Sequence, residues 1–409
     1  MAAQVDQADP AAAGAAPVDP SMATAAQIPL QTFTIPDFPR QAGSLKALTL
    51  TSDIKLDEYS NLVAKDAAFT VPESLPRGIE SLTLELFSLG YPPGFLTQLA
   101  ARLPYLKSLV VYSQLLGGVS PESQDDALRF VDAEPHLRAL HLLDVFAKPG
   151  FFSRLGESLR SEGTRGRGLM FLEVNYSFRH EDEDFLTRVQ GAELPGLVAP
   201  GLITCAFNIA PPDVTDDPED PANLTSEGEP LPAEQRRKEG VMAFNRTLAP
   251  ALVDALTAEE TAPRNLKVLN STLYTLTTES LGKILGAHKG LMVLSATVEL
   301  EPTEQCKKEL LGMLGKLETL EQVEIVGNPS LEFYLAVHTP KNKALDNVFP
   351  SEEDMKALAE KCPKLSNFKA GILRTTSMGT VEWTKKGGKW NGGIVYPDPP
   401  KEESKEASK

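Results

Sequence analysis

Residues that could bind a metal ion or act as nucleophiles are few and widely spaced in this sequence. A zinc site or a redox pair needs cysteines and histidines at short, regular intervals, and no Cys-x-x-Cys pair occurs. The sequences His-Glu-x-x-His, Gly-x-Ser-x-Gly and Gly-x-x-x-x-Gly-Lys-Ser/Thr are also absent. The sequence therefore predicts a protein that is not an enzyme, with no metal and no cofactor. The histidines and cysteines are His136, His141, His180, His288, His338, Cys205, Cys306 and Cys362.

Two other groups of residues have the wrong pattern for a catalytic or cofactor site. The glycines of Gly163-Thr-Arg-Gly166-Arg-Gly168 do not have the spacing of a dinucleotide loop, so we interpret them as a flexible basic turn. The run Glu181-Asp-Glu-Asp184 is typical of a solvated loop. Neither group changes the prediction of a non-enzyme.

The net charge of the chain limits the classes of partner. Lys and Arg number 40 against 56 Asp and Glu, which gives a net charge of −16 at pH 7. A protein that binds nucleic acid through its phosphates needs a basic surface, so no nucleic-acid partner is expected. No stretch is apolar over 18 or more residues, and residues 1–30 do not resemble a secretory signal. We expect no membrane partner and a location in the cytoplasm, the nucleus or both.

One apolar pattern recurs along the chain, an apolar residue followed by others at the fourth and sixth positions. Most first positions are about 30 residues apart, and the step of 64 residues from Leu202 to Leu266 is about two periods. The units are Leu45-Leu48-Leu50, Ile79-Leu82-Leu84, Leu106-Leu109-Val111, Leu137-Leu140-Leu142, Leu169-Leu172-Val174, Leu202-Cys205-Phe207, Leu266-Leu269-Ser271, Leu291-Leu294-Ala296, Leu320-Val323-Ile325 and Leu365-Phe368-Ala370.

The segments between these units have the periodicity of helices. Apolar side chains at Phe95, Leu96, Leu99 and Leu103 fall on one helical stripe. Several of these segments are followed by a proline just before the next apolar unit, as at Pro104, and proline ends a helix. The chain therefore alternates between strand and helix.

This alternation resembles the leucine-rich repeat superfamily, of the ribonuclease-inhibitor-like kind. The segment Leu320-Glu-Gln-Val-Glu-Ile-Val-Gly-Asn328 carries the complete repeat pattern, whereas the ninth-position Asn or Cys is mostly missing elsewhere. The resemblance implies an α/β solenoid with a curved parallel sheet and helices on its convex face. An ordinary α/β domain with parallel strands is the alternative fold. The repeats are also similar to those of fungal F-box/leucine-rich-repeat proteins, but residues 1–43 contain no recognisable F-box.

The composition divides the chain into four parts. We expect a disordered Ala/Pro-rich tail over residues 1–30, a solenoid over 31–378, a hairpin cap over 379–397 and a charged tail over 398–409. Residues 211–240 form a Pro-rich insertion with nine acidic and three basic residues, which is either a disordered loop or a docking segment for a basic partner. The hairpin carries Trp383 and Trp390, and an aromatic binding platform is the alternative to a cap.

The repeat pattern also indicates which side chains face a partner. The fourth and sixth residues of each strand face the core, so the third, fifth and seventh face the concave side. On this face we single out Tyr112, His141, Phe171, Glu173 and Asn175 as candidate partner-binding residues, because aromatic side chains with polar neighbours are typical of interface hot spots. The alternative is that Tyr112 and Phe171 only stack on each other.

These features predict a non-enzymatic scaffold that binds a partner protein on its concave face. Two alternatives stay open. The first is a substrate-recognition adaptor of a ubiquitin ligase, which the similarity to F-box/leucine-rich-repeat proteins suggests. The second is an acidic, chaperone-like binder of basic proteins, which the net charge and residues 211–240 suggest.

Overall fold

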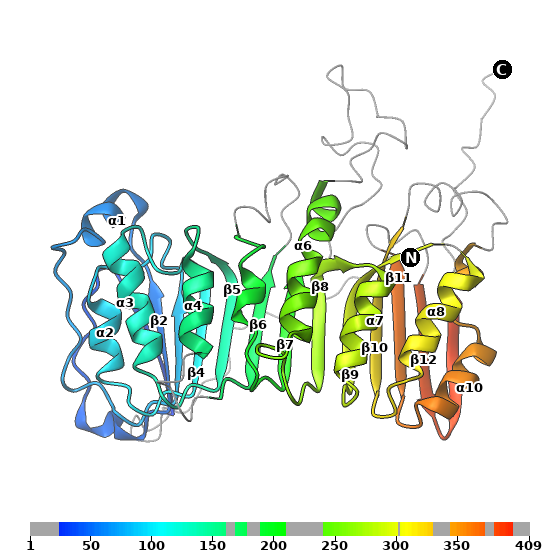
Figure 1. Cartoon of the computed structure of the whole chain (residues 1–409). Coiled ribbons are helices and arrows are strands. Elements are labelled where there is room, and N and C mark those ends of the chain that lie inside the picture. Colours follow the sequence, from blue (N-terminus) through cyan, green and yellow to red (C-terminus); the bar gives the residue numbers. More distant parts are fainter. Residues whose placement is uncertain are drawn as a thin grey trace, which may run out of the picture.

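Each apolar triplet of the sequence forms one strand of a single sheet. The computed structural model describes residues 24–160, 168–177, 189–209, 240–301, 303–329, 344–372 and 380–395. Within them, 13 strands lie side by side in the order of the sequence (Figure 1). The strands are β1 (Ala25–Leu30), β2 (Ala47–Ser52), β3 (Ser81–Glu85), β4 (Ser108–Leu115), β5 (Ala139–Phe146), β6 (Phe171–Tyr176), β7 (Thr204–Ile209), β8 (Val268–Leu276), β9 (Val293–Leu300), β10 (Gln322–Pro329), β11 (Asn367–Ile372), β12 (Thr380–Lys386) and β13 (Lys389–Val395).

Strands β1 to β11 are parallel, and their register builds the apolar ladder that the repeats predict. Leu82 pairs with Leu109, Leu109 with Leu140, and Leu140 with Leu172, and all four side chains are buried. Side chains alternate along a strand. The residues before and after each of these leucines therefore point to the other face of the sheet, where the side chains of β2 and β3 stay partly exposed. The predicted α/β leucine-rich repeat solenoid is thus confirmed by the topology of the sheet.

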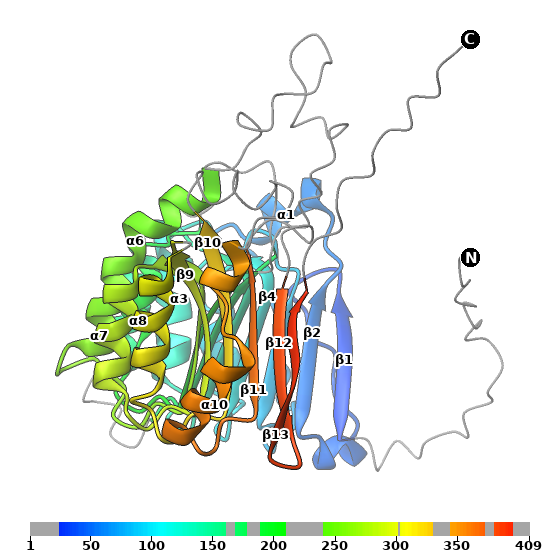
Figure 2. The ribbon, with the colours of Figure 1, turned by 90° about the vertical axis from the view of Figure 1, so that its right-hand side faces the viewer.

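The helices lie along the other side of this apolar ladder. They cover one face of the sheet (Figure 1), and in the turned view helices and strands form two layers (Figure 2). No helix in the described ranges is long and apolar enough to cross a membrane. The helical segments are η2 (Arg40–Ser44), α1 (Leu56–Leu62), α2 (Phe95–Ala100), α3 (Pro121–Asp132), α4 (Phe151–Arg160), η4 (Leu194–Leu197), α6 (Gly240–Thr257), α7 (Thr278–Ala287), α8 (Glu304–Leu314), η6 (Ala344–Asn347) and α10 (Glu352–Lys361).

Buried polar side chains connect neighbouring repeats across the helical layer. The carboxylate of Asp126 in α3 accepts hydrogen bonds from the N–H groups of Leu96 and Thr97, at 2.9 and 3.1 Å, in the first turn of α2. The Tyr176 hydroxyl donates to the carbonyl of Val145 in the preceding strand. The bonds to Leu96 and Val145 satisfy backbone groups of buried residues.

The amino-terminal boundary differs from the prediction. Residues 25–30 were expected to belong to the disordered tail, but they form strand β1, which pairs in parallel with β2 from Ala25–Ala47 to Leu30–Ser52. This segment buries Leu30 against the first repeat, although it lacks the leucine triplet of the later strands. Pro29 is compatible with pairing because β1 is an edge strand, where one side needs no N–H donor. Residues 1–23 lie outside the described residues.

The carboxyl-terminal segment is the hairpin β12–β13, which pairs antiparallel to β11. Gly387 and Gly388 form its turn with φ of 57° and 80°, values that glycine adopts without strain. Trp383 and Trp390 are buried, and the Trp383 indole N–H donates to the carbonyl of Pro350. The two tryptophans therefore pack into the end of the core.

The long step between the sixth and seventh repeats contains no additional strand among the described residues, because β7 pairs directly with β8. Most of the acidic insertion, residues 210–239, lies outside the described residues, as do the run 181–184, His180, His338 and the charged tail 398–409.

Candidate functional site on the open face

The open face of the sheet is the face opposite the helices, and its side chains form three rows that cross the strands. The middle row is continuous in register from β2 to β12, so neighbouring members of the row come from neighbouring strands. Its members are Thr49, Thr83, Val110, His141, Glu173, Ala206, Asn270, Ser295, Glu324, Lys369 and Glu382. The lower row begins each strand, and the upper row lies two residues beyond the middle one.

His141 and Glu173 form the polar centre of this face. They are paired in register on β5 and β6, and Nδ1 of His141 lies 2.8 Å from Oε2 of Glu173. Both side chains are about two-thirds buried. When Nδ1 carries the proton and donates to the carboxylate, Nε2 is an acceptor for a donor on a partner. When both nitrogens are protonated, the pair becomes a charge-assisted hydrogen bond.

Tyr112 and Phe171 are exposed on either side of this pair. Tyr112 is 40% exposed and lies in the upper row beside Leu143, whereas Phe171 is 41% exposed and lies in the lower row beside Ala139. The two rings are thus two strands and four residues apart. At about 4.8 Å per strand and 3.3 Å per residue, their α-carbons are about 16 Å apart.

This separation rules out the stacking alternative. The rings do not stack on each other, because stacking needs ring centroids within about 7 Å. The two rings also do not line one common pocket. Asn175 lies in the upper row between Leu143 and Asn208, so the candidate residues form a diagonal surface rather than one pocket.

Further carboxylates on the open face follow from the register and were not singled out in the sequence. Glu85 accepts a hydrogen bond from Thr51 at 2.8 Å, and Glu324 accepts one from Ser295 at 3.0 Å. Glu382 forms an ion pair with Lys369 at 3.4 Å. Glu324 is the fifth residue of its repeat and Glu85 the seventh, and both positions point away from the core. These positions could therefore have identified the two carboxylates from the sequence.

The open face is not equally accessible along its length. From β7 to β9 four of its side chains are buried, while others, such as Asn208 and Asn270, are half-buried. The buried four are Ala206, Thr275, Ser295 and Thr297. The register of β8 also shifts between Ser271 and Thr275, where a bulge interrupts pairing with β9. From β2 to β6 the same rows are half-buried or exposed. A partner therefore has access to the part of the face that carries Tyr112, His141, Phe171 and Glu173.

No group of three or more His, Cys, Asp or Glu side chains in the described ranges could hold a metal ion. Burial raises the pKa of the Cys205 thiol to about 12, so it stays protonated and unreactive near neutral pH. Burial also lowers the pKa of His288, whose Nε2 lies 2.7 Å from the carbonyl oxygen of Leu256.

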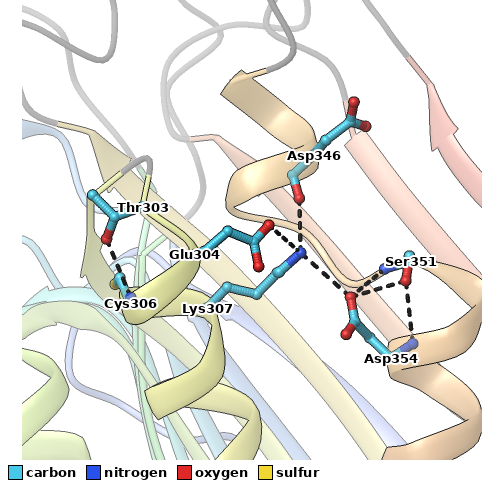
Figure 3. Close-up of polar contacts among 7 residues, drawn as sticks. All are labelled: Thr303, Glu304, Cys306, Lys307, Asp346, Ser351 and Asp354. Carbon is cyan, nitrogen blue, oxygen red and sulfur yellow. Dashed lines mark hydrogen bonds and ion pairs between the residues drawn. The ribbon is translucent and has the colours of Figure 1, made fainter.

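Lys307 in α8 is a buried charge with a structural explanation (Figure 3). It is 7% exposed, and its ammonium group contacts Glu304 at 2.9 Å, Asp354 at 3.4 Å and the carbonyl oxygen of Asp346 at 2.8 Å. These contacts connect α8 with η6 and α10. Because the three donors of the ammonium group have partners, Lys307 fits a structural connection rather than a catalytic amine.

No protein-family model matches the chain, and no curated protein sequence matches it. Similar solved structures include the Rad7–Elc1 complex of yeast, which is 17% identical in sequence with a TM-score of 0.29. That match covers 79% of this chain and 75% of the matched chain. An internalin, InlF, of Listeria monocytogenes is 11% identical with a TM-score of 0.32, and the match covers 86% of this chain and 83% of the internalin. The TLR13–ssRNA13 complex has 14% identity, covers 74% of this chain and 39% of that chain, and has a TM-score of 0.30. The fold assignment therefore rests on the sheet itself.

Proposed function

We propose that this protein is a non-enzymatic scaffold of the cytoplasm or nucleus that binds a partner protein on the open face of its sheet, over β4 to β6. The observation that carries the proposal is the His141–Glu173 pair, at 2.8 Å, flanked diagonally by the exposed rings of Tyr112 and Phe171. Aromatic side chains with positioned polar groups beside them supply most of the binding energy in protein interfaces.

The fold favours this use because it presents the surface rigidly. The backbone of β4, β5 and β6 is held by pairing on both sides, and the next residues along each strand are buried leucines and valines. A partner that binds here does not have to order a loop, so less of the interaction energy is lost to conformational entropy. Repeat solenoids present long surfaces in this way.

Affinity capture of the intact chain, followed by mass spectrometry, identifies the partner for the test. The double variant Tyr112→Ala, Phe171→Ala should then weaken binding of the captured partner by at least about 2 kcal/mol, or about 30-fold. Both side chains are partly exposed, so the variant should keep its fold, which circular dichroism and thermal melting check.

Trp383 and Trp390 provide the matched control, because they are aromatic but buried in the terminal hairpin. Trp383→Phe should lower thermal stability and leave the affinity unchanged. Wild-type affinity of the double variant, together with lost binding in a folded Trp383→Phe protein, would move the binding site to the carboxyl-terminal hairpin.

A second candidate function is an acidic binder of basic proteins. It is favoured by four carboxylates in the rows of the open face, Glu85, Glu173, Glu324 and Glu382, whereas the middle row contains one lysine, Lys369. Such binding should weaken steeply between about 50 and 300 mM salt, because surface charges are screened over about 10 Å at 0.1 M. Capture of a cullin-adaptor subunit would instead support a role in a ubiquitin ligase.

A further inference from the structure

The amino-terminal edge of strands β2 to β5 carries a cluster of basic side chains in an otherwise acidic protein. The backbone ladder extends one residue beyond these strands, since the N–H of Lys107 donates to the carbonyl of Glu80 and the N–H of Arg138 to that of Lys107. Lys46, Lys107 and Arg138 therefore lie along one edge, which is the lower edge of the sheet in Figure 1. Arg77 and Arg102 lie in the turns that lead into β3 and β4.

Two carboxylates of this edge, Glu80 and Glu73, are already paired with its cations. Oε1 of Glu80 lies 2.9 Å from Nζ of Lys46, and Oε2 lies 2.6 Å from Nζ of Lys107. Hydrogen bonds from Lys107 and Lys46 lower the pKa of Glu80 to about 2, which is the response of a carboxylate to surrounding positive charge. Glu73 lies 3.5 Å from Arg102. Neither Arg77 nor Arg138 pairs with a carboxylate among the described residues.

Two aromatic rings lie beside these cations. Tyr105 and His136 precede β4 and β5 at equivalent repeat positions, and their rings stack with centroids 6.3 Å apart and an angle of 24° between planes. Tyr105 is 57% exposed, one of the largest exposed fractions of any large apolar side chain described. The equivalent position in the β3 repeat is Gly78, which has no side chain to cover the outer face of the Tyr105 ring.

We propose that this basic edge (Lys46, Arg77, Arg102, Lys107 and Arg138, with the stacked rings of Tyr105 and His136) is a second protein-binding surface that takes an acidic segment of a partner containing an aromatic residue. The partner's carboxylates would bind the guanidinium and ammonium groups, for which Arg has a matching bidentate geometry. Its aromatic side chain would continue the ring stack over Tyr105.

The dimensions and charge of the edge favour a short peptide segment over a nucleic acid. From β2 to β5 the edge spans three strand spacings, about 14 Å, which corresponds to four or five residues of an extended peptide. A nucleic-acid strand carries a phosphate on every nucleotide and would continue from this edge onto the surface of a protein with net charge −16.

The test selects peptides from a phage-displayed library of random 12-residue sequences on the full-length chain, with counter-selection on the Arg77→Glu, Arg138→Glu variant. We expect the selected peptides to combine Asp or Glu residues with an aromatic residue. The best one, synthesised with a fluorescent label, should lose at least about fivefold in affinity by anisotropy with either Tyr105→Ala or Arg138→Ala, whereas Tyr105→Phe should retain binding.

Two controls separate this surface from the open face. The Tyr112→Ala, Phe171→Ala variant should bind the selected peptide with wild-type affinity, so this proposal can fail while the proposed function stands, and the reverse also holds. If the Arg77→Glu, Arg138→Glu variant does not fold, Arg77→Glu alone replaces it in the counter-selection, because the Arg77 side chain is exposed. Selected peptides that are not acidic, peptides that lose binding with the open-face variant, or a labelled heptauridylate that binds more tightly than the peptide would each overturn the proposal.

Discussion

The ammonium group of Lys307 lies 3.4 Å from Oδ2 of Asp354, and this contact joins the helices of two successive repeats, α8 and α10. Asp354 also accepts hydrogen bonds from the N–H and hydroxyl of Ser351, at 2.9 and 3.0 Å, in the capping box that begins α10 (Figure 3). One carboxylate therefore caps its own helix and connects it to the preceding repeat.

The first prediction concerns the pH dependence of stability at Asp354. Burial raises the pKa of this carboxyl, but the hydrogen bonds from Ser351 and the charge of Lys307 outweigh burial and lower it below the ordinary value. A carboxyl with a lowered folded-state pKa stabilises the fold above its unfolded pKa, about 3.9, and this contribution is lost as the pH falls through the folded-state value. Asp354→Asn should thus be less stable than wild type at pH 7, by up to about 1 kcal/mol for a partly exposed group.

Urea unfolding of wild type and Asp354→Asn between pH 2.5 and 7 measures this contribution. The difference in free energy of unfolding should shrink below about pH 4. Lys308→Met is the control, because Lys308 is exposed on the same helix, α8, and forms no ion pair among the described residues. A difference that stays constant down to pH 2.5 would show that Asp354 acts through packing instead.

The second prediction concerns the apolar ladder. Leu140 is buried in the centre of the sheet, between Leu109 and Leu172 in register. Leu140→Ala should lower the free energy of unfolding by about 2–5 kcal/mol, because the rigid strands on both sides cannot close the cavity. Thermal melting checks this outcome, with Val110→Ala on the open face as the milder control. An unchanged melting temperature would place Leu140 outside the core.

The third prediction concerns the carboxylate that caps α2 from the next repeat. Asp126→Ala leaves the N–H of the buried Leu96 without its acceptor and also removes the bond to the N–H of Thr97, at a cost of about 1–3 kcal/mol. Asp125→Ala is the matched control, since Asp125 is exposed and contacts only Arg154 among the described residues. Equal stabilities of the two variants in urea would contradict a capping role for Asp126.

The sequence identifies the interior of this fold better than its connections. The triplets place Leu82, Leu109 and Leu140 on neighbouring strands because burial of a repeated apolar face determines the register. Strand β1 was missed because it pairs only at the edge and contributes one fully buried leucine, Leu30. A pattern of short-range periodicity does not detect such a strand.

The contacts between helices are even less accessible to sequence patterns. Lys307 and Asp354 are 47 positions apart, and Asp126 lies about 30 positions from the amides it caps, so both contacts depend on how the helices pack. The separation of the two candidate rings, by contrast, could have been predicted from the repeat positions alone. Phe171 is the third residue of its repeat and Tyr112 the seventh, and this difference alone separates the rings along the strands.

The last prediction uses that separation. Because the α-carbons of Tyr112 and Phe171 are about 16 Å apart, the two rings contact different parts of a partner, and their effects on binding should add to within about 0.5 kcal/mol. His141 and Glu173 share a hydrogen bond of 2.8 Å, so their effects should not add. Removal of either one disrupts the same contact, and a coupling energy of about 0.5–3 kcal/mol is expected for such a pair.

Two double-mutant cycles on the captured partner, measured by calorimetry, test this directly. The first cycle combines Tyr112→Ala with Phe171→Ala, and the second combines His141→Ala with Glu173→Ala. Strong coupling between the two rings would mean that the partner inserts a single group between them, which the register of β4 to β6 does not favour. Additive losses in the second cycle would show that His141 and Glu173 act independently and that their hydrogen bond is not part of the interface. No loss in either single variant of that cycle would assign the binding energy to the rings alone.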